Sequence, residues 1–374
     1  MNTIPKQRLT VSLVNLLLVV SIGLLLVLLW QLRGLLVTLM IAVVLAATLS
    51  PVIEKAQKLQ IPRWLAVIVV YLSLISLLTG VGVLIGPTVV QQIERLIRRL
   101  PAYLEIVRSL LENLIIRFGI GGPDSPTPIR QLFNTQAISG WLIRSSQQLV
   151  VRSYSVTRGI LGGFFSLILS LVLSGYLLSG SKSLIQGLVS LFPKPWDERL
   201  EAQVAPVAQR MGGYIQGRVL VSGILGIAIT IGLRVLGLSE FAVALGVIAG
   251  VTNLIPFFGP VLGAIPALIV AIAQGGLTFF WTLLLFVIIQ NLETYVLDPL
   301  LVGNSVKVHP LYQLLAVLGG TQVLGIIGAL IVPPWVAGAA VLLENLYLKP
   351  KLQAEQEAIL VAQTTDTTPI PVNR

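Results

Sequence analysis

The chain has 374 residues, of which 55% are hydrophobic and only 11% are charged, and its mean hydropathy is +0.92. This composition excludes an ordinary soluble protein, in which about a quarter of the residues are charged, and indicates a polytopic membrane protein. The sequence contains no cysteine, which excludes disulfides, Cys-ligated zinc and a cysteine nucleophile. The net charge of +10 fits basic residues at membrane flanks better than a nucleic-acid surface. We therefore expect membrane lipid, and no nucleic acid, among the partners.

Four charge-free runs in the first half are long enough to cross a hydrocarbon core, which needs about 20 apolar residues of helix. They cover residues 9–32, 34–53, 64–93 and 159–181. The first run is too long for a cleaved signal peptide and is interpreted as a retained helix. Basic residues lie before the first run and between the second and third, so the positive-inside rule places both segments in the cytoplasm.

Residues 88–158 are predicted to form an amphipathic helical insert outside the membrane. Between residues 93 and 118, apolar side chains keep helical spacing while charged side chains take the other face. Pro101 is expected to begin a second helix, because proline fits a first turn and disrupts a helix interior. A loop rich in Gly and Pro is expected at 119–128. The favoured role of the insert is a membrane-surface or oligomer-contact helix.

The C-terminal half contains a long apolar region whose helix must break. No charge falls between Glu240 and Glu293, yet Pro256, Gly259 and Pro260 interrupt the run. Two prolines four residues apart remove backbone donors, and the glycine between them permits a tight reversal. Broken backbone within hydrocarbon is tolerated only where protein or water covers it. We therefore expect two short helices, at about 241–254 and 261–273, that meet tip to tip.

A second interrupted segment follows at 311–333. It contains Gly325 and Gly328 among other glycines and ends at Pro333 and Pro334. Paired interrupted segments are typical of transporter binding sites, where helix ends direct backbone groups at a substrate or ion. Single glycines also serve close helix packing, so the double-proline turn is the stronger signal.

Polar residues lie between the two interruptions. Gln290, Asn291 and Glu293 end an apolar run. A carboxylate within the membrane is costly and marks a functional site by default, so Glu293 either faces a water-filled cavity or lies at the helix end in the headgroup region. Asp298 precedes a proline and is interpreted as a turn starter. His309 also precedes a proline and is interpreted as a loop residue, because the sequence has no second histidine to share a metal.

Enzymatic functions are not supported by these residues. An intramembrane aspartyl protease needs paired carboxylates, but Asp298 is the only Asp in residues 214–348. A serine hydrolase needs a serine with a placed base, and no such motif surrounds His309. The sequence has no phosphate-binding loop and no nucleotide fingerprint. We expect no enzyme activity, no cofactor and no bound metal.

The order of these motifs resembles the AI-2E family of transporters, also described as PerM-like permeases. The matching residues are Ile255-Pro256-Phe257-Phe258-Gly259-Pro260, Gly263, Pro266, Gln290, Glu293, Pro299, Gly303, His309-Pro310, Gly325, Gly328 and Pro333. Members are associated with export of autoinducer-2 or with sodium/proton exchange. The resemblance therefore implies a homo-oligomeric secondary transporter for a small polar solute, or for sodium and protons. A passive channel or a membrane scaffold of the same fold, without coupled transport, is the alternative.

The resemblance also implies a multi-pass protein of the bacterial plasma membrane with cytoplasmic termini. The expected fold is all-α, with about 8 hydrophobic segments that include interrupted or re-entrant helical hairpins. Five regions are expected: three transmembrane helices in 1–87, the external insert in 88–158, a fourth transmembrane helix and a cytoplasmic amphipathic helix in 159–213, a transport core in 214–348, and a disordered cytoplasmic tail in 349–374.

The candidate substrate or ion path is drawn from the interrupted segments and the polar run between them. Its expected members are Glu293, Gln290, Asn291, Asn253, Pro256, Gly259, Pro260 and Arg218, with a secondary set of Asp298, His309, Gly325 and Gly328. Arg218 departs from the family pattern, in which an uncharged Gln is expected at this position. An added positive charge there matters if the side chain faces the path.

Overall fold

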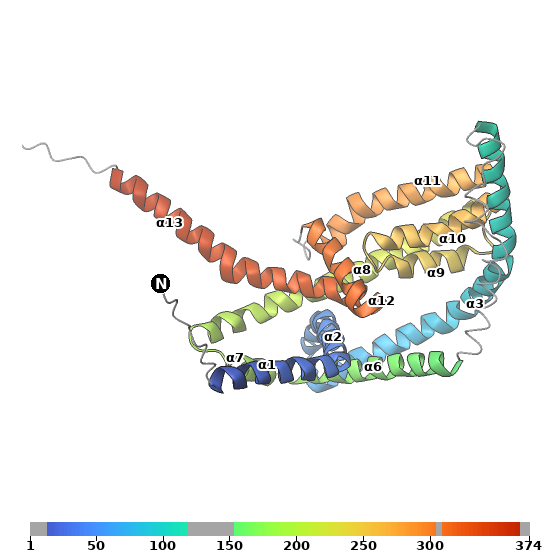
Figure 1. Cartoon of the computed structure of the whole chain (residues 1–374). Coiled ribbons are helices and arrows are strands. Elements are labelled where there is room, and N and C mark those ends of the chain that lie inside the picture. The colour runs from blue at the N-terminus through green and yellow to red at the C-terminus, as the bar shows by residue number, and fades with distance from the viewer. Residues whose placement is uncertain (1–12, 119–152, 304–308, 367–374) are drawn as a thin grey trace, which may run out of the picture.

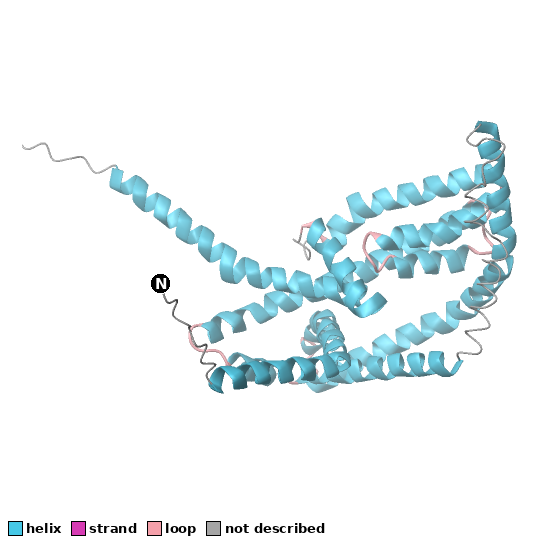
Figure 2. Ribbon diagram, viewed as in Figure 1, coloured by secondary structure: helices cyan, strands magenta, loops and turns pink. Residues whose placement is uncertain are grey.

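The computed structural model describes residues 13–118, 153–303 and 309–366, and every regular element in these ranges is a helix (Figure 2). Five of the described helices are long and apolar enough to cross a membrane, or six if the bent pair Phe165–Ser179 and Ser181–Val189 forms one span. Figure 1 shows several long helices lying roughly parallel, with one end of the bundle crossed by α3 (Arg63–Phe118). The predicted fold class, an all-α polytopic membrane protein, is confirmed.

The four apolar runs of the first half all lie in helices. They form α1 (Leu13–Gln31), α2 (Arg33–Gln57), the first part of α3, and α6 (Ser153–Ser179). A buried cluster joins α2, α3 and α6 through Leu49, Ile53, Ala66, Val67, Val70 and Leu178. The hydroxyls of Tyr71 and Ser174 also form a hydrogen bond between α3 and α6. A smaller buried cluster of Val44, Ala47 and Met211 joins α2 to α8 (Trp196–Val235).

The third helix is longer than the sequence predicted. It runs for 56 residues and passes through Pro101, so the prediction that Pro101 begins a second helix is wrong. Contacts on both sides of the proline hold the helix in place: Arg99 pairs with Glu240 at 2.8 Å, and the ring of Tyr103 packs edge-on against Phe241. Tertiary contacts thus override the disruption that proline causes in a helix interior. The loop expected at 119–128, and the insert as far as residue 152, lie outside the described residues.

The amphipathic piece expected at 182–213 consists of α7 (Ser181–Val189) and the first part of α8 (Trp196–Val235). Acidic residues occupy the first turn of α8, where they interact favourably with the positive end of the helix dipole. The helix is continuous for 40 residues, so the expected boundary between residues 213 and 214 falls within it. Its second half supplies buried apolar residues to the core, among them Val221, Leu225, Ile229 and Leu233.

The double-proline turn joins two short helices, α9 (Ala242–Thr252) and α10 (Phe258–Gln274). They lie side by side as a hairpin rather than meeting only at their tips. A Cβ added at Gly259 would lie 2.5 Å from Asn253 Cα, and one at Gly263 would lie 2.7 Å from Ala249 Cα. Glycine is therefore what allows the two backbones to approach so closely. Phe257 has a φ of 66° at the turn, a left-handed conformation that is uncommon outside glycine.

The second interrupted segment lies in α12 (Pro310–Leu343), which breaks at Gly325 with φ 66° and ψ −152°. A Cβ added at Gly320 would lie 3.0 Å from the Cβ of Val332, although twelve residues of straight helix span about 18 Å. The two arms of α12 therefore fold back on each other at Gly325. The sequence indicated Pro333 and Pro334 as the end of the first part, but both prolines lie buried within the second arm.

Three further elements complete the C-terminal half. They are α11 (Gly276–Leu292), the π-helix η1 (Glu293–Val302) and the short π-helix η2 (Glu344–Leu348). The chain then continues as α13 (Lys349–Asp366), which projects away from the bundle in Figure 1.

The prediction of a disordered tail from residue 349 is wrong as far as Asp366. The segment extends an existing helix, so it avoids the cost of nucleation. Its Gln, Glu, Ala and Lys residues also favour helix, and Lys351 pairs with Glu355 one turn later at 3.7 Å. Residues 367–374 lie outside the described residues.

Candidate functional site

A buried cluster of charges links α8, the α9–α10 hairpin and η1. Arg218 Nη1 lies 3.1 Å from Glu293 Oε1 and 3.2 Å from Asp298 Oδ1. Asn253, at the hairpin turn, donates from Nδ2 to Glu293 Oε1 at 3.0 Å. The side chains of Arg218 and Glu293 are 6% and 3% exposed, whereas that of Asp298 is 39% exposed. We call these four residues the charge cluster.

Glycines on α8 and α9 allow neighbouring elements to approach the α8 backbone around Arg218. A Cβ added at Gly217 would lie 2.5 Å from the carbonyl oxygen of Leu301, so η1 packs directly on the α8 backbone. On the hairpin side, a Cβ added at Gly250 would lie 2.9 Å from the carbonyl oxygen of Ser222. The sequence thus places Arg218 where two other segments can surround it.

The π-helical winding of η1 brings its two carboxylates to the same guanidinium. Glu293 and Asp298 are five residues apart, and the i→i+5 hydrogen bonds of a π-helix stack residues with this spacing. One such bond joins Gly303 N–H to the Asp298 carbonyl at 2.7 Å. In α-helical winding, residues five apart point about 140° away from each other. Short π-helical segments occur frequently at functional sites.

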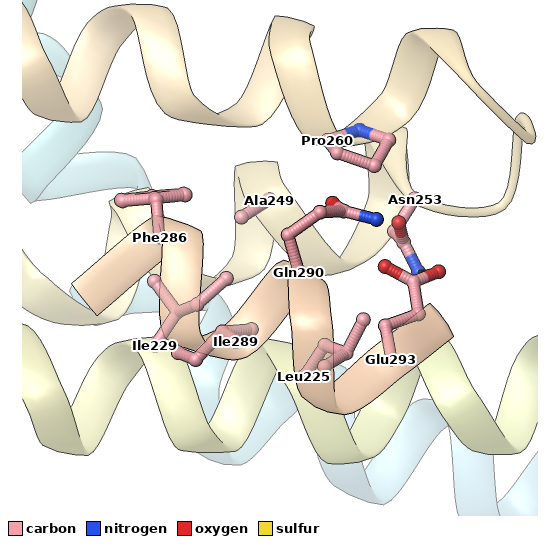
Figure 3. Close-up of a pocket in the computed structure, with 9 residues that line it drawn as sticks. All are labelled: Leu225, Ile229, Ala249, Asn253, Pro260, Phe286, Ile289, Gln290 and Glu293. Carbon is pink, nitrogen blue, oxygen red and sulfur yellow. Dashed lines mark hydrogen bonds between the residues drawn. The ribbon is translucent and has the colours of Figure 1, made fainter. Parts of the chain in front are cut away.

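A small cavity lies beside the cluster, between α8, the hairpin and α11 (Figure 3). In Figure 3 the side chains of Asn253, Gln290 and Glu293 point toward one another, with Pro260 above them. The apolar part of the lining comes from Leu225, Ile229, Ala249, Phe286 and Ile289. Only about 20 Å³ of this space can be occupied by the centre of a water molecule, which is room for roughly one water and far less than a small-molecule pocket of about 300–1,000 Å³ provides.

The structure brings most of the expected path residues together. Glu293, Gln290, Asn253 and Pro260 line the cavity, and Arg218 pairs with Glu293. Pro256 is buried in the hairpin turn, and Gly259 packs against Asn253. Asp298, interpreted from the sequence as a turn starter, belongs to the charge cluster. Glu293 is therefore buried and lines the cavity, directly after the end of α11.

Other expected residues lie apart from the cluster. Asn291 is exposed and donates to the carbonyl of Val287 at 2.7 Å, so the structure does not bring it into the charge cluster. Exposed His309 precedes α12, where its Nδ1 accepts from Leu311 N–H at 3.3 Å. Gly325 and Gly328 form the reversal of α12. Both glycines allow the backbone of α12 to fold back on itself, and no hydrogen bond among the described residues joins either of them to the charge cluster.

Sequence reasoning missed two polar groups of α8. Tyr214, one turn before Arg218, accepts a hydrogen bond at its hydroxyl from Gln313 Nε2 at 3.3 Å. Ser222, one turn after Arg218, has a buried hydroxyl without a hydrogen-bond partner among the described residues. The four-residue spacing of Tyr214, Arg218 and Ser222 was the available signal, because it places all three on one helix face.

Some polar atoms of the charge cluster make no hydrogen bond to a described residue. Arg218 Nε is buried without a hydrogen-bond partner among the described residues. Within those residues, both hydrogen bonds to the Glu293 carboxylate go to Oε1. The described part of the chain has no group of three His, Asp or Glu residues placed to hold a metal ion. With both acids ionised, one guanidinium faces two carboxylates, so the cluster carries one net negative charge.

Comparison with known proteins agrees with this architecture. The family described as "AI-2E family transporter" matches this sequence over residues 17–348. The chain belongs to this family. The AI-2E match includes every element of the charge cluster and both interrupted segments.

Several curated AI-2E-like relatives carry transport names. "Putative transport protein YrrI" of Bacillus subtilis is 30% identical over 80% of this chain and 82% of its own length. "Putative transport protein YueF" of the same organism is 26% identical over 79% of each chain. A Mycobacterium tuberculosis protein, "Putative transport protein MT0215", is 25% identical over 83% of each chain. These names and the family match indicate a transport protein.

Proposed function

We propose that the protein is a secondary transporter in which the charge cluster binds the transported or coupling species. The candidates are export of a small polar solute, such as an autoinducer-2-like sugar, and exchange of sodium for protons. The single observation that carries the proposal is the buried arrangement of Arg218, Glu293 and Asn253 at the tip of a broken helix pair. Buried charges cost several kcal/mol even when paired, and within a membrane they mark ion and substrate paths.

The net charge of the cluster suggests how coupling would work. One proton or one sodium ion beside Glu293 would neutralise the excess negative charge. Asn253 donates to this same carboxylate. Among the described residues, this is the only side-chain hydrogen bond between the hairpin turn and η1. Binding of a proton or a sodium ion to the carboxylate would therefore change the strength of that bond. The charge state of Glu293 would thus control how strongly the hairpin turn is bound to η1.

The size of the cavity separates the two candidate cargoes. An ion or a single water fits the roughly 20 Å³ that the cavity offers, whereas a sugar-like solute needs a pocket of the usual small-molecule size. Solute export therefore requires the hairpin turn to move away from Glu293. Ion exchange requires no such enlargement.

The orientation proposed from the basic loops has both termini in the cytoplasm, in a bacterial plasma membrane. The start of α8 and α13 then lie on the cytoplasmic side. A homo-oligomer is proposed on the family resemblance.

Flux measurements in proteoliposomes test the proposal. Purified protein is reconstituted with internal sodium or an autoinducer-2-like sugar, and efflux is followed under imposed proton and sodium gradients. Coupled transport predicts flux that runs against the gradient of the cargo and stops when the driving gradient is collapsed. A channel would only equilibrate the cargo, and a scaffold would give no flux; either result contradicts the proposal.

Glu293→Gln provides the site-specific arm of this test. The amide keeps the shape of the side chain and its hydrogen-bonding capacity but removes the charge. Gradient-driven flux should fall at least about tenfold, because an intramembrane carboxylate that binds the coupling ion has no substitute. The matched control is Glu240→Gln, which removes an equivalent charge from the pair with Arg99 outside the cluster. Retained flux in Glu293→Gln would remove Glu293 from the path.

A further inference from the structure

Polar side chains form a stripe along α8 that leads to the charge cluster. Arg210, Tyr214 and Arg218 follow one another at intervals of four residues, which places them on one face of the helix. Arg210 Nη2 lies 3.7 Å from Glu344 Oε2, and Gln203, nearer the start of α8, accepts from Asn345 Nδ2 at 2.7 Å. Polar groups of η2 therefore face this side of α8, and Gln313 near the start of α12 does the same at Tyr214.

Exposure decreases along this stripe toward the cluster. The side chain of Glu344 is 36% exposed and that of Arg210 is 15% exposed, whereas Tyr214 is only 2% exposed. The Arg210 pair is long for an ion pair, and Arg210 Nη1 has no hydrogen-bond partner among the described residues. Water that enters from the start of α8 would therefore first reach the long, partly exposed pair of Arg210 and Glu344 and then the buried Tyr214.

Tyr214 is held by the first arm of α12. Its hydroxyl accepts from Gln313 Nε2 at 3.3 Å, and Gln313 lies in the first turn after Pro310. The arm that carries Gln313 ends at Gly325, where the backbone reverses. An arm between a proline and a glycine break can swing without unfolding the rest of the helix.

We propose that the hydrogen bond between Tyr214 and Gln313 is the inner closure that separates the charge cluster from water on the side where α8 begins. This inference rests on the proposed transport function, because a closure matters only where the cluster exchanges with water. The second interrupted segment then opens and closes access, while the first contributes to binding. Tyr214 acts by holding Gln313, and with it the first arm of α12, in position.

A cysteine-accessibility assay tests the closure directly. The chain contains no cysteine, so Ser222→Cys supplies a single thiol one turn beyond Arg218, at a hydroxyl that makes no bond to a described residue. A charged, membrane-impermeant thiol reagent is added to one side of reconstituted vesicles, and the rate of modification is measured from each side. The reporter is then combined with Tyr214→Phe or Gln313→Met, each of which removes one half of the hydrogen bond and keeps the bulk of the side chain.

The closure predicts a rate increase of about two- to tenfold in either variant, the range that the loss of one hydrogen bond allows. The increase should appear only from the side that carries the start of α8. Combining both substitutions should add little to the larger single effect, because they remove the same bond. The matched control is Tyr71→Phe, which removes the hydroxyl that bonds Ser174 between α3 and α6 and should leave the rate unchanged.

Unchanged rates in both variants would overturn the closure. Equal acceleration from the two sides, or an equal effect of Tyr71→Phe, would also overturn it, because a general loosening of the fold explains those results. The assay needs no transport. Side-specific acceleration together with a failure of gradient-driven flux would support the closure and contradict the proposed transport function.

Discussion

Arg218 and Glu293 form an ion pair of 3.1 Å between side chains that are only 6% and 3% exposed. The pair joins the long helix α8 to the π-helix η1, and Asn253 adds the hairpin turn to it. Three segments that are distant in the sequence therefore meet at one carboxylate.

Removing Arg218 should strongly destabilise the protein. Arg218→Met leaves Glu293 and Asp298 without their cation, and breaking a buried pair from one side costs about 3–5 kcal/mol. Adding Glu293→Gln to this variant should recover part of the loss, because it removes one uncompensated charge. Thermal unfolding in detergent measures both effects. Arg99→Met, which breaks an exposed pair with Glu240, serves as the control and should cost less than about 1 kcal/mol.

The close approach of α9 and α10 should not tolerate a methyl group at Gly259. In Gly259→Ala the added carbon would lie 2.5 Å from Asn253 Cα, and overpacking of this kind costs about 1–3 kcal/mol. The variant should unfold at lower temperature and bind its cargo more weakly, because Asn253 shifts with the turn. Gly276→Ala at the start of α11 meets open space, so its unfolding temperature should be unchanged or slightly raised.

The reversal in α12 should depend on Gly325. Its φ of 66° and ψ of −152° lie in a region that is essentially restricted to glycine, and a side chain there costs about 1–3 kcal/mol. Gly325→Ala should therefore lower the unfolding temperature. The neighbouring Gly319→Ala adds a methyl group in open space and provides the comparison. Equal unfolding temperatures for the two variants would show that the chain does not reverse at Gly325.

Exposed residues at the two ends of the bundle should label from opposite sides of the membrane. Arg98→Cys lies in α3 next to Arg99, which pairs with Glu240, and Glu198→Cys lies in the first turn of α8; both positions are exposed. In intact cells an impermeant thiol reagent should modify only the first, and Glu198→Cys should react only after lysis. Labelling of both positions in intact cells would contradict the proposed orientation.

The sequence was sufficient to predict the first hairpin because proline and glycine act locally. Pro256, Gly259 and Pro260 determine what the backbone can do regardless of distant contacts, and Glu293 stands out because charge is costly within a membrane. The role of Asp298 could not be predicted, since its position beside Arg218 depends on π-helical winding. The path of α3 through Pro101 depends on its partners Glu240 and Phe241, which lie far away in the sequence.

The second break was misplaced for a related reason. Pro333 and Pro334 suggested an end, but a helix can hold a proline where packing supports it, and both prolines are buried in the second arm. Gly325 resembled the other glycines of the segment in sequence. Only the contact between the two arms, at Gly320 and Gly328, identifies it as the point of reversal.

The π-helical winding of η1 also provides a way to move the Asp298 carboxylate away from Arg218, by a local change in helix winding. Rewinding one turn from π to α would rotate Asp298 by roughly a quarter of a turn relative to Glu293, since an α-helix advances about 100° per residue and a π-helix advances less. Arg218 would then keep one carboxylate and lose the other. A change of winding confined to ten residues would thus alter the charge beside Arg218.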